Sequence, residues 1–285
     1  MPRLTIGDLI PLLRRHYSLG GYACVETFPY QVKPIERIIG RIPLDEFKWE
    51  DVERYKEIRL DEDVTLASIN RELDYLSRGF SLALEARIVD EGKVPRIRRF
   101  RLSNARQGFL YPDEFLLIWK HLPPILQDIS MFAYWSGWRK GEILKLTWDL
   151  VQGDVARIRD KNRDSKPAPL VGYIRTVIDR RREEMLDGCD LVFHQDGKPI
   201  VRFYKTWATA VRRSGLSRDI VFHDLRRSFV NNARQAGIDR SVIMKLTGHK
   251  THLVFDRYNI VCDAELERAA RRIMGLDDEG ASTTG

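Results

Sequence analysis

The stretch VTLASINRELDYLSRGFSLALEARI, residues 64–88, constrains the fold more than any other segment. Its apolar residues recur at steps of three and four, at Leu66, Ile69, Leu73, Leu76, Phe80 and Ala83. This spacing puts them on one face of an α-helix, which turns once every 3.6 residues. A helix with a long apolar face must bury that face, so residues 1–92 are predicted to form a helical domain around this segment.

Residues 93–107 have a different composition from the segments on either side. The run KVPRIRRFRLSNAR has six basic residues and no acidic one, which predicts an interdomain linker. The charge of the linker has two interpretations, an ordinary solvated loop or a strap lying against phosphates. The formal net charge of +7 favours an anionic partner, of which nucleic acid is the commonest. The candidate DNA-binding side chains are Asn70, Arg71, Arg96, Arg98, Arg99 and Arg101.

Between residues 108 and 276, predicted helices alternate with short predicted strands. A helix begins at Lys140 and continues through KGEILKLTWDLV, while VARIR (155–159) and APLVG (168–172) are predicted strands around a polar hairpin. The fold class is therefore mostly α with a small β-sheet, divided between a helical and a mixed α/β domain. Residues 277–285 are small and polar, and they are predicted to form a flexible tail.

Several classes of protein are disfavoured by what the sequence lacks. The three cysteines, Cys24, Cys189 and Cys262, have no metal-binding spacing and no paired pattern, which fits a reducing compartment. No stretch approaches the ~20 apolar residues that a membrane-spanning helix needs. The chain is therefore expected to be cytoplasmic, without a metal site and without a membrane partner.

Residues 223–261, HDLRRSFVNNARQAGIDRSVIMKLTGHKTHLVFDRYNIV, gather imidazole, guanidinium and phenol groups. His223 and Arg226 are three residues apart and lie on one side of a helix. A Gly-His pair ends at His249, and Tyr258 follows nine residues later. Each feature alone is more often structural, as a buried histidine, a helix cap or a packed aromatic ring. Their occurrence together favours a site for phosphate chemistry.

This segment resembles the C-terminal signature of the tyrosine recombinases, the phage-integrase family. The family pattern is a His-x-x-Arg helix, a Gly-His pair and a nucleophilic tyrosine about nine residues later. SGWRKGEILKLTW is similar to the family's first arginine box, which implies that Arg139 is a catalytic arginine and Glu142 its acidic support. RIRDKNRDSKPAPL is similar to the hairpin that carries the family's lysine, which implies Lys161, with Lys166 as the alternative.

The resemblance implies a site-specific DNA recombinase of the integrase type, with a helical core-binding domain and a mixed α/β catalytic domain. Tyr258 would attack a DNA phosphate and form a 3′-phosphotyrosyl intermediate. His223 would take or share the phenol proton, and Lys161 would protonate the departing 5′ oxygen. The donors to the phosphate oxygens would be Arg139, Arg226 and His249. No cofactor is expected, because the phosphotyrosyl bond stores the energy of the broken phosphodiester.

The implied partner is double-stranded DNA. The family acts as a homotetramer on paired sites and exchanges strands through a Holliday junction; the free protein is expected to be a monomer or a dimer. Two alternatives stay open. A type IB topoisomerase-like enzyme would use the same chemistry without a partner site, and a non-catalytic recombinase relative would only bind DNA.

Overall fold

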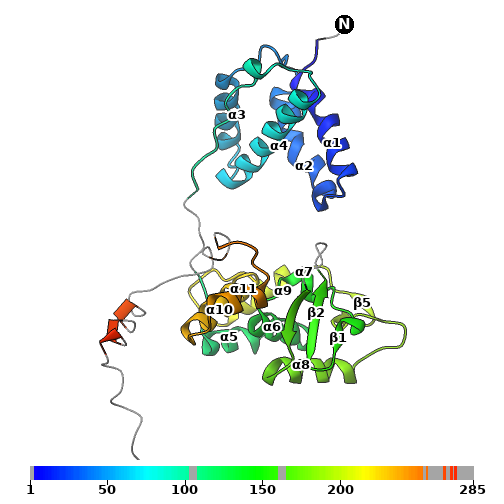
Figure 1. Ribbon diagram of the computed structural model, residues 1–285, viewed down its shortest axis with the longest axis vertical. Helices are drawn as coiled ribbons and strands as arrows, with labels where there is room; N and C mark the ends of the chain where they lie inside the picture. The colour runs from blue at the N-terminus through cyan, green and yellow to red at the C-terminus, as the bar shows by residue number, and fades with distance from the viewer. Residues whose placement is uncertain are drawn as a thin grey trace, which may run out of the picture. The chain divides into compact units, whose positions relative to one another are not determined.

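The computed structural model describes residues 3–102, 108–159 and 165–252, and also residues 255, 266, 267, 270, 271, 273 and 274. Of residues 23, 24, 159 and 165 it describes the backbone alone. The chain divides into two compact units, Met1–Asn104 and Ala105–Gly285 (Figure 1). None of the helices within the described ranges is both long enough and apolar enough to cross a membrane.

The described part of the first unit is built from four α-helices. They are α1 (Leu9–Leu19), α2 (Phe28–Ile39), α3 (Trp49–Asp61) and α4 (Leu66–Glu85), with 3-10 turns at Ile6–Asp8, Ala23–Glu26 and Glu91–Lys93. Helix α4 is the helix predicted from the apolar spacing, and it packs against the other three. Thr65 caps it by accepting a hydrogen bond from the Ser68 amide. Five of the six predicted apolar positions are buried, and Leu66 in the first turn is exposed.

Residues 94–100 pack against the helices of the first unit. Val94, Ile97 and Phe100 contact its apolar core, and the Lys56 ammonium lies 5.2 Å from the centre of the Phe100 ring. The Asn70 amide group bonds the backbone of Phe100 twice, donating to its carbonyl at 2.9 Å and accepting from its N–H at 2.8 Å. The first part of the basic segment therefore has a fixed path along α3 and α4.

The described part of the second unit combines helices with two small antiparallel sheets. Its helices are α5 (Pro112–Trp119), α6 (Pro124–Ser136), α7 (Lys140–Ile143), α8 (Gly172–Glu183), α9 (Tyr204–Arg213), α10 (Asp224–Gln235) and α11 (Arg240–Thr247), with a 3-10 turn at Trp148–Leu150. The strands β1 (Val151–Gln152), β2 (Val155–Arg159) and β3 (Ser165–Pro169) form one sheet in chain order. The strands β4 (His194–Gln195) and β5 (Lys198–Pro199) form a separate hairpin.

Helix α6 lies at the centre of the second unit. It is buried along most of its length and packs against α8 and α10 (Figure 1). It ends at Gly137, whose φ of 65° is the left-handed conformation that glycine adopts without strain. A Cβ at this position would lie 2.5 Å from Cδ1 of Phe229 on α10, so the close approach of the two segments requires glycine. This turn brings Trp138 and Arg139 to the start of α7.

The prediction of a mostly helical chain with a small sheet is confirmed. Two local predictions were wrong in extent. The helix from Lys140 stops at Ile143, because Leu146 and Thr147 pair with residues 191–192 and lead the chain into β1. The strand predicted over 168–172 runs over Ser165–Pro169 instead, since its register with β2 pairs Ile158 with Lys166 and helix α8 begins at Gly172.

Candidate active site

Arg139 and Glu142 form the first corner of the site. Arg139 is the N-cap residue of α7, and its backbone N–H donates to the Glu142 carboxylate at 2.6 Å. Its guanidinium donates to the same carboxylate at 3.0 Å, and its side chain is 46% exposed. The pair lies in the first turn of a helix, where a carboxylate is favourable. Glu142 therefore orients Arg139 and leaves its guanidinium accessible to solvent.

Lys166 on β3 completes this corner. Its ammonium donates to Glu142 Oε2 at 2.5 Å and lies 5.4 Å from the centre of the buried Trp138 ring. Burial lowers the pKa of Lys166 to about 7; Glu142 opposes this shift, while Arg226 and Arg139 add to it. Burial alone would raise the pKa of Glu142, but Lys166 and Arg139 outweigh it and hold that pKa below its ordinary value.

Arg226, on α10, and His249, just after the end of α11, meet in the interior. Arg226 on α10 is 1% exposed, and it donates to the carbonyl of Gly137 at 2.7 Å. Its other terminal nitrogen lies 2.7 Å from Nε2 of His249. His249 follows Gly248, whose φ of 70° ends α11 and turns the imidazole toward Arg226. The buried ring has a pKa lowered to about 3, first by loss of solvent and then by the charges of Arg226, Arg139 and Lys166.

His223 stands at the start of α10 as its N-cap residue, and its side chain remains exposed. Its pKa is lowered because the surrounding protein partly desolvates the ring and because Arg226 and Arg139 repel a further positive charge. The imidazole is therefore neutral near pH 7, which is the form that can accept a proton.

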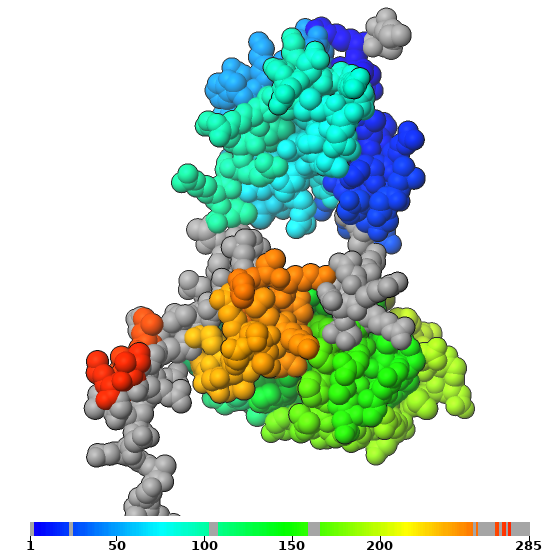
Figure 2. Space-filling view, viewed as in Figure 1, coloured from blue at the N-terminus to red at the C-terminus, as the bar shows by residue number. Residues whose placement is uncertain are grey.

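Arg139, Glu142, Lys166 and His249 line a cavity of about 730 Å³. Helix α11 contacts β3, and the orange atoms of α11 lie on the face of the second unit seen in Figure 2. The lining residues are Arg139, Glu142, Lys166, Ser241, Met244, Lys245, Gly248, His249, Lys250 and His252. Arg226 does not line the cavity, but it contacts His249, which does. The wall is dense in cationic side chains, a composition that suits an anionic group such as a phosphate.

The structure brings together Arg139, Glu142, Arg226 and His249, and His223 interacts electrostatically with both arginines. Lys161 and Tyr258 lie outside the described residues. No group of three or more histidine, cysteine, aspartate or glutamate side chains suited to a metal ion occurs in the described ranges.

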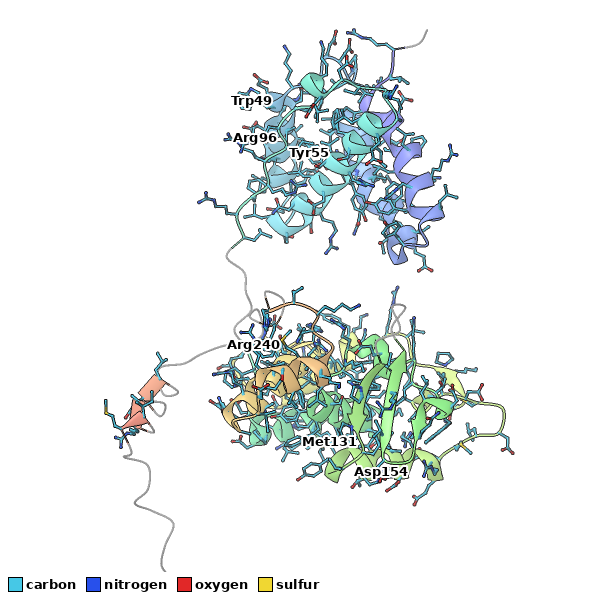
Figure 3. All side chains as sticks on the ribbon, viewed as in Figure 1. Trp49, Tyr55, Arg96, Met131, Asp154 and Arg240 are labelled. Carbon is cyan, nitrogen blue, oxygen red and sulfur yellow. The ribbon has the colours of Figure 1, made fainter. Side chains whose placement is uncertain are left out.

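The candidate DNA-binding side chains on the first unit have different surroundings. Asn70 is buried with its amide bonded to Phe100, and Arg99 is ion-paired with Asp74. Arg71, Arg96, Arg98 and Arg101 are exposed. Arg96 and Arg98 line a groove of about 1150 Å³ together with Trp49, which is 58% exposed (Figure 3).

Two residues of the site were missed by sequence reasoning. The ring of Trp138 packs under Lys166, and the hydroxyl of Thr247 lies 2.8 Å from Nδ1 of His249. Trp138 stands next to Arg139 in the chain, and Thr247 stands two residues before His249. Proximity to the motif residues was the only available signal, since the side-chain directions follow from the turns at Gly137 and Gly248.

The fold is that of DNA-bound integrases of known structure. A lambda integrase dimer bound to a COC′ core site superposes with a TM-score of 0.73 at 17% identity, covering 99% of this chain and 80% of that one. The Tn1549 transposon integrase in complex with a circular intermediate DNA gives a TM-score of 0.76 at 14% identity, with 95% and 99% covered. These likenesses define the class of fold. The family model described as "Phage integrase family" matches residues 109–265, more than half of the chain, and the chain therefore belongs to the phage integrase family.

Curated relatives match between about half and nearly all of the chain. The integrase of Salmonella phage P22 is 27% identical over 197 residues, which are 64% of this chain and 51% of the relative. The tyrosine recombinase XerD of Corynebacterium glutamicum is 31% identical over 142 residues, 45% of this chain and 46% of the relative. The chain thus spans about half the length of these two proteins. A tyrosine recombinase of Thermosipho africanus is 20% identical over 281 residues, with 93% and 97% covered.

Proposed function

We propose that this chain is a site-specific DNA recombinase that cleaves and rejoins strands through a 3′-phosphotyrosyl intermediate. The observation that carries the proposal is the convergence of four segments at one cavity, which Arg139, Lys166 and His249 line and where Arg226 contacts His249. Burying a cation costs free energy unless an anion pairs with it. A DNA phosphate is the anion on which this family acts. Family membership adds independent support.

In the proposed reaction, the Tyr258 phenol oxygen attacks phosphorus and the bond from phosphorus to the 5′ oxygen breaks. The phenol proton passes to neutral His223, and the departing 5′ oxygen takes a proton from a lysine. The negative charge that develops on the phosphate is stabilised by Arg139 and by Arg226 behind His249. Attack of a second strand's 5′ hydroxyl reverses these steps. One phosphoester replaces another each time, so no nucleotide hydrolysis is required.

We propose Lys166, rather than Lys161, as the proton donor, because it lines the cavity and has a pKa of about 7. Lys166→Ala is expected to slow cleavage by ~10²–10⁴-fold on ordinary DNA, as for loss of a general acid. A substrate with sulfur at the 5′ bridging position needs no protonation of the leaving group, so it should restore the rate. With ordinary DNA, the wild-type rate should fall as the pH rises through 7, because the neutral amine cannot donate.

The matched control for this lysine is Lys161→Ala, measured on the same two substrates. Its rate on ordinary DNA should stay close to that of the wild type. A slow Lys161→Ala variant that the sulfur substrate rescues would return the role of proton donor to Lys161.

We further propose that the active assembly is a homotetramer on two duplexes. A solved lambda integrase tetramer bound to a Holliday junction has a TM-score of 0.75 to this chain at 18% identity, which supports the fold of each subunit. The exposed Arg96, Arg98 and Arg101 would contact phosphates along the path that Asn70 fixes. These contacts would position the protein on DNA without reading its sequence.

A plasmid assay separates the proposal from its two alternatives. The purified chain is first footprinted on DNA that flanks its own gene, and the protected site is cloned into a supercoiled plasmid as one or two copies. Recombination is expected only with two copies. Relaxation of the one-copy plasmid without recombination of the other would indicate a type IB topoisomerase-like enzyme, and protection without any strand cleavage would indicate a DNA-binding relative.

A further inference from the structure

Thr247, His249 and Arg226 form a buried hydrogen-bonded chain beside the cavity. Nε2 of His249 lies 2.7 Å from a terminal nitrogen of Arg226, and Nδ1 lies 2.8 Å from the hydroxyl of Thr247. That hydroxyl donates in turn to the carbonyl of Ile243, at 2.7 Å. Thr247 is fully buried and His249 is 5% exposed, so bulk water does not compete for these contacts.

The direction of each bond follows from the chemistry of the groups. A guanidinium has donors and no acceptor, so Nε2 of His249 must accept from Arg226. A neutral imidazole carries one proton, which therefore stays on Nδ1 and is donated to Thr247. The threonine hydroxyl accepts this proton while giving its own to Ile243. Each of these three hydrogen bonds thus pairs one donor with one acceptor.

The alternative protonation states conflict with the same geometry. An imidazolium or an Nε2–H tautomer would point a proton at the donating nitrogen of Arg226. Two donors at 2.7 Å repel each other, and Arg226, Arg139 and Lys166 all disfavour a further positive charge on the ring. The ring of Phe255 lies edge-on to His249 with centroids 5.8 Å apart, which restricts the imidazole further.

We propose that Thr247 is a positioning residue that holds His249 in its Nδ1–H tautomer, so that Nε2 can orient the Arg226 guanidinium beside the cavity. A second group that fixes the ring of a functional histidine is a common device in active sites. His249 would then prepare Arg226 in the DNA-free protein, a role different from that of a phosphate donor. The consequence for cleavage rests on the proposed function, whereas the tautomer does not.

The tautomer can be measured directly in the full chain. The chain has six histidines, and a ¹⁵N-histidine sample compared with His249→Asn assigns the two ring nitrogens of His249. At neutral pH we expect a protonated Nδ1 with a slowly exchanging proton and an unprotonated Nε2. A protonated Nε2 in the wild-type protein would overturn the proposal, whether or not the chain cleaves DNA.

Three variants then test the role of the hydroxyl. Thr247→Val keeps the side-chain shape but removes the acceptor, so the Nδ1 proton signal should be lost to exchange, and cleavage of the footprinted site should slow by ~10–100-fold. Thr247→Ser should retain both properties. Thr176→Val is the control for loss of a helical threonine, since Thr176 on α8 also donates to a carbonyl four residues earlier, at 3.3 Å, and does not line the cavity.

The outcomes separate the two proposals. Loss of the signal in Thr247→Val with an unchanged cleavage rate would overturn the positioning role, and so would a retained signal. If the wild-type chain cleaves no DNA, the proposed function fails, while the NMR measurement still decides the arrangement of the three side chains. Far-UV circular dichroism checks that Thr247→Val is folded. If this variant does not fold, the ¹⁵N NMR spectrum of wild-type His249 decides the proposal.

Discussion

A Tyr258→Phe variant is expected to bind its DNA site with wild-type affinity and to form no covalent adduct. The substitution removes one oxygen atom, and with it the proposed nucleophile, while every cationic side chain described in the cavity wall is retained. Loss of a nucleophile commonly lowers rates by ~10⁴-fold or more. The assay uses the footprinted duplex with a nick near the cleavage position, which traps the protein on its 3′ phosphate.

The control for this experiment is Tyr204→Phe, which removes the hydroxyl of a highly exposed tyrosine on α9. This variant should form the adduct at the wild-type rate, and the adduct should migrate as protein-linked DNA in a denaturing gel until it is digested with protease. An adduct that persists in Tyr258→Phe would assign the nucleophile to another residue and would sink the proposed mechanism.

An Arg226→Lys variant is expected to cleave DNA at a rate lower by ~10²–10³-fold, as for loss of one preorganised donor. The lysine keeps the charge but cannot bridge the carbonyl of Gly137 and Nε2 of His249, which the guanidinium contacts at 2.7 Å each. Both the orientation of the donor and the contact with the imidazole are lost. Single-turnover cleavage, measured at saturating protein, separates this effect from weaker DNA binding.

Arg227→Lys is the matched control for that substitution. Arg227 is the next residue on α10, is also largely buried, and pairs with Asp224 at 3.3 Å. A lysine can maintain the ion pair with Asp224, so the cleavage rate should change little. Equal losses in the two variants would mean that the substitutions act through folding of α10, a result that the unfolding temperature of each variant would reveal.

Much of the fold could be predicted from local pattern. The apolar spacing over 64–88 predicted α4, because steps of three and four residues put the apolar side chains on one helical face. Helix ends were less predictable. The helix from Lys140 ends after one turn, since the backbone of Leu146 and Thr147 pairs with residues 191–192, which are distant in the chain. No local propensity reports such a pairing.

The candidate site divides in a similar way. The order and spacing of Arg139, His223, Arg226, His249 and Tyr258 indicated the family from the sequence alone, and the chemistry assigned to them stays a prediction. The buried position of Lys166 against Glu142 was not predictable, because it depends on the register of β3 with β2. The hydrogen bonds of Asn70 could not be predicted from the sequence either. Its amide group bonds the backbone of Phe100, which is 30 residues away in the chain.

The sequence by itself determined which functional groups this protein possesses, since side-chain chemistry and helical spacing are local properties. Only the tertiary structure decided what each group contacts, because hydrogen-bond direction and burial arise between segments distant in the chain. The left-handed turns at Gly137 and Gly248 set the carbonyl and the imidazole on either side of Arg226, and that geometry fixes which nitrogen of His249 holds the proton.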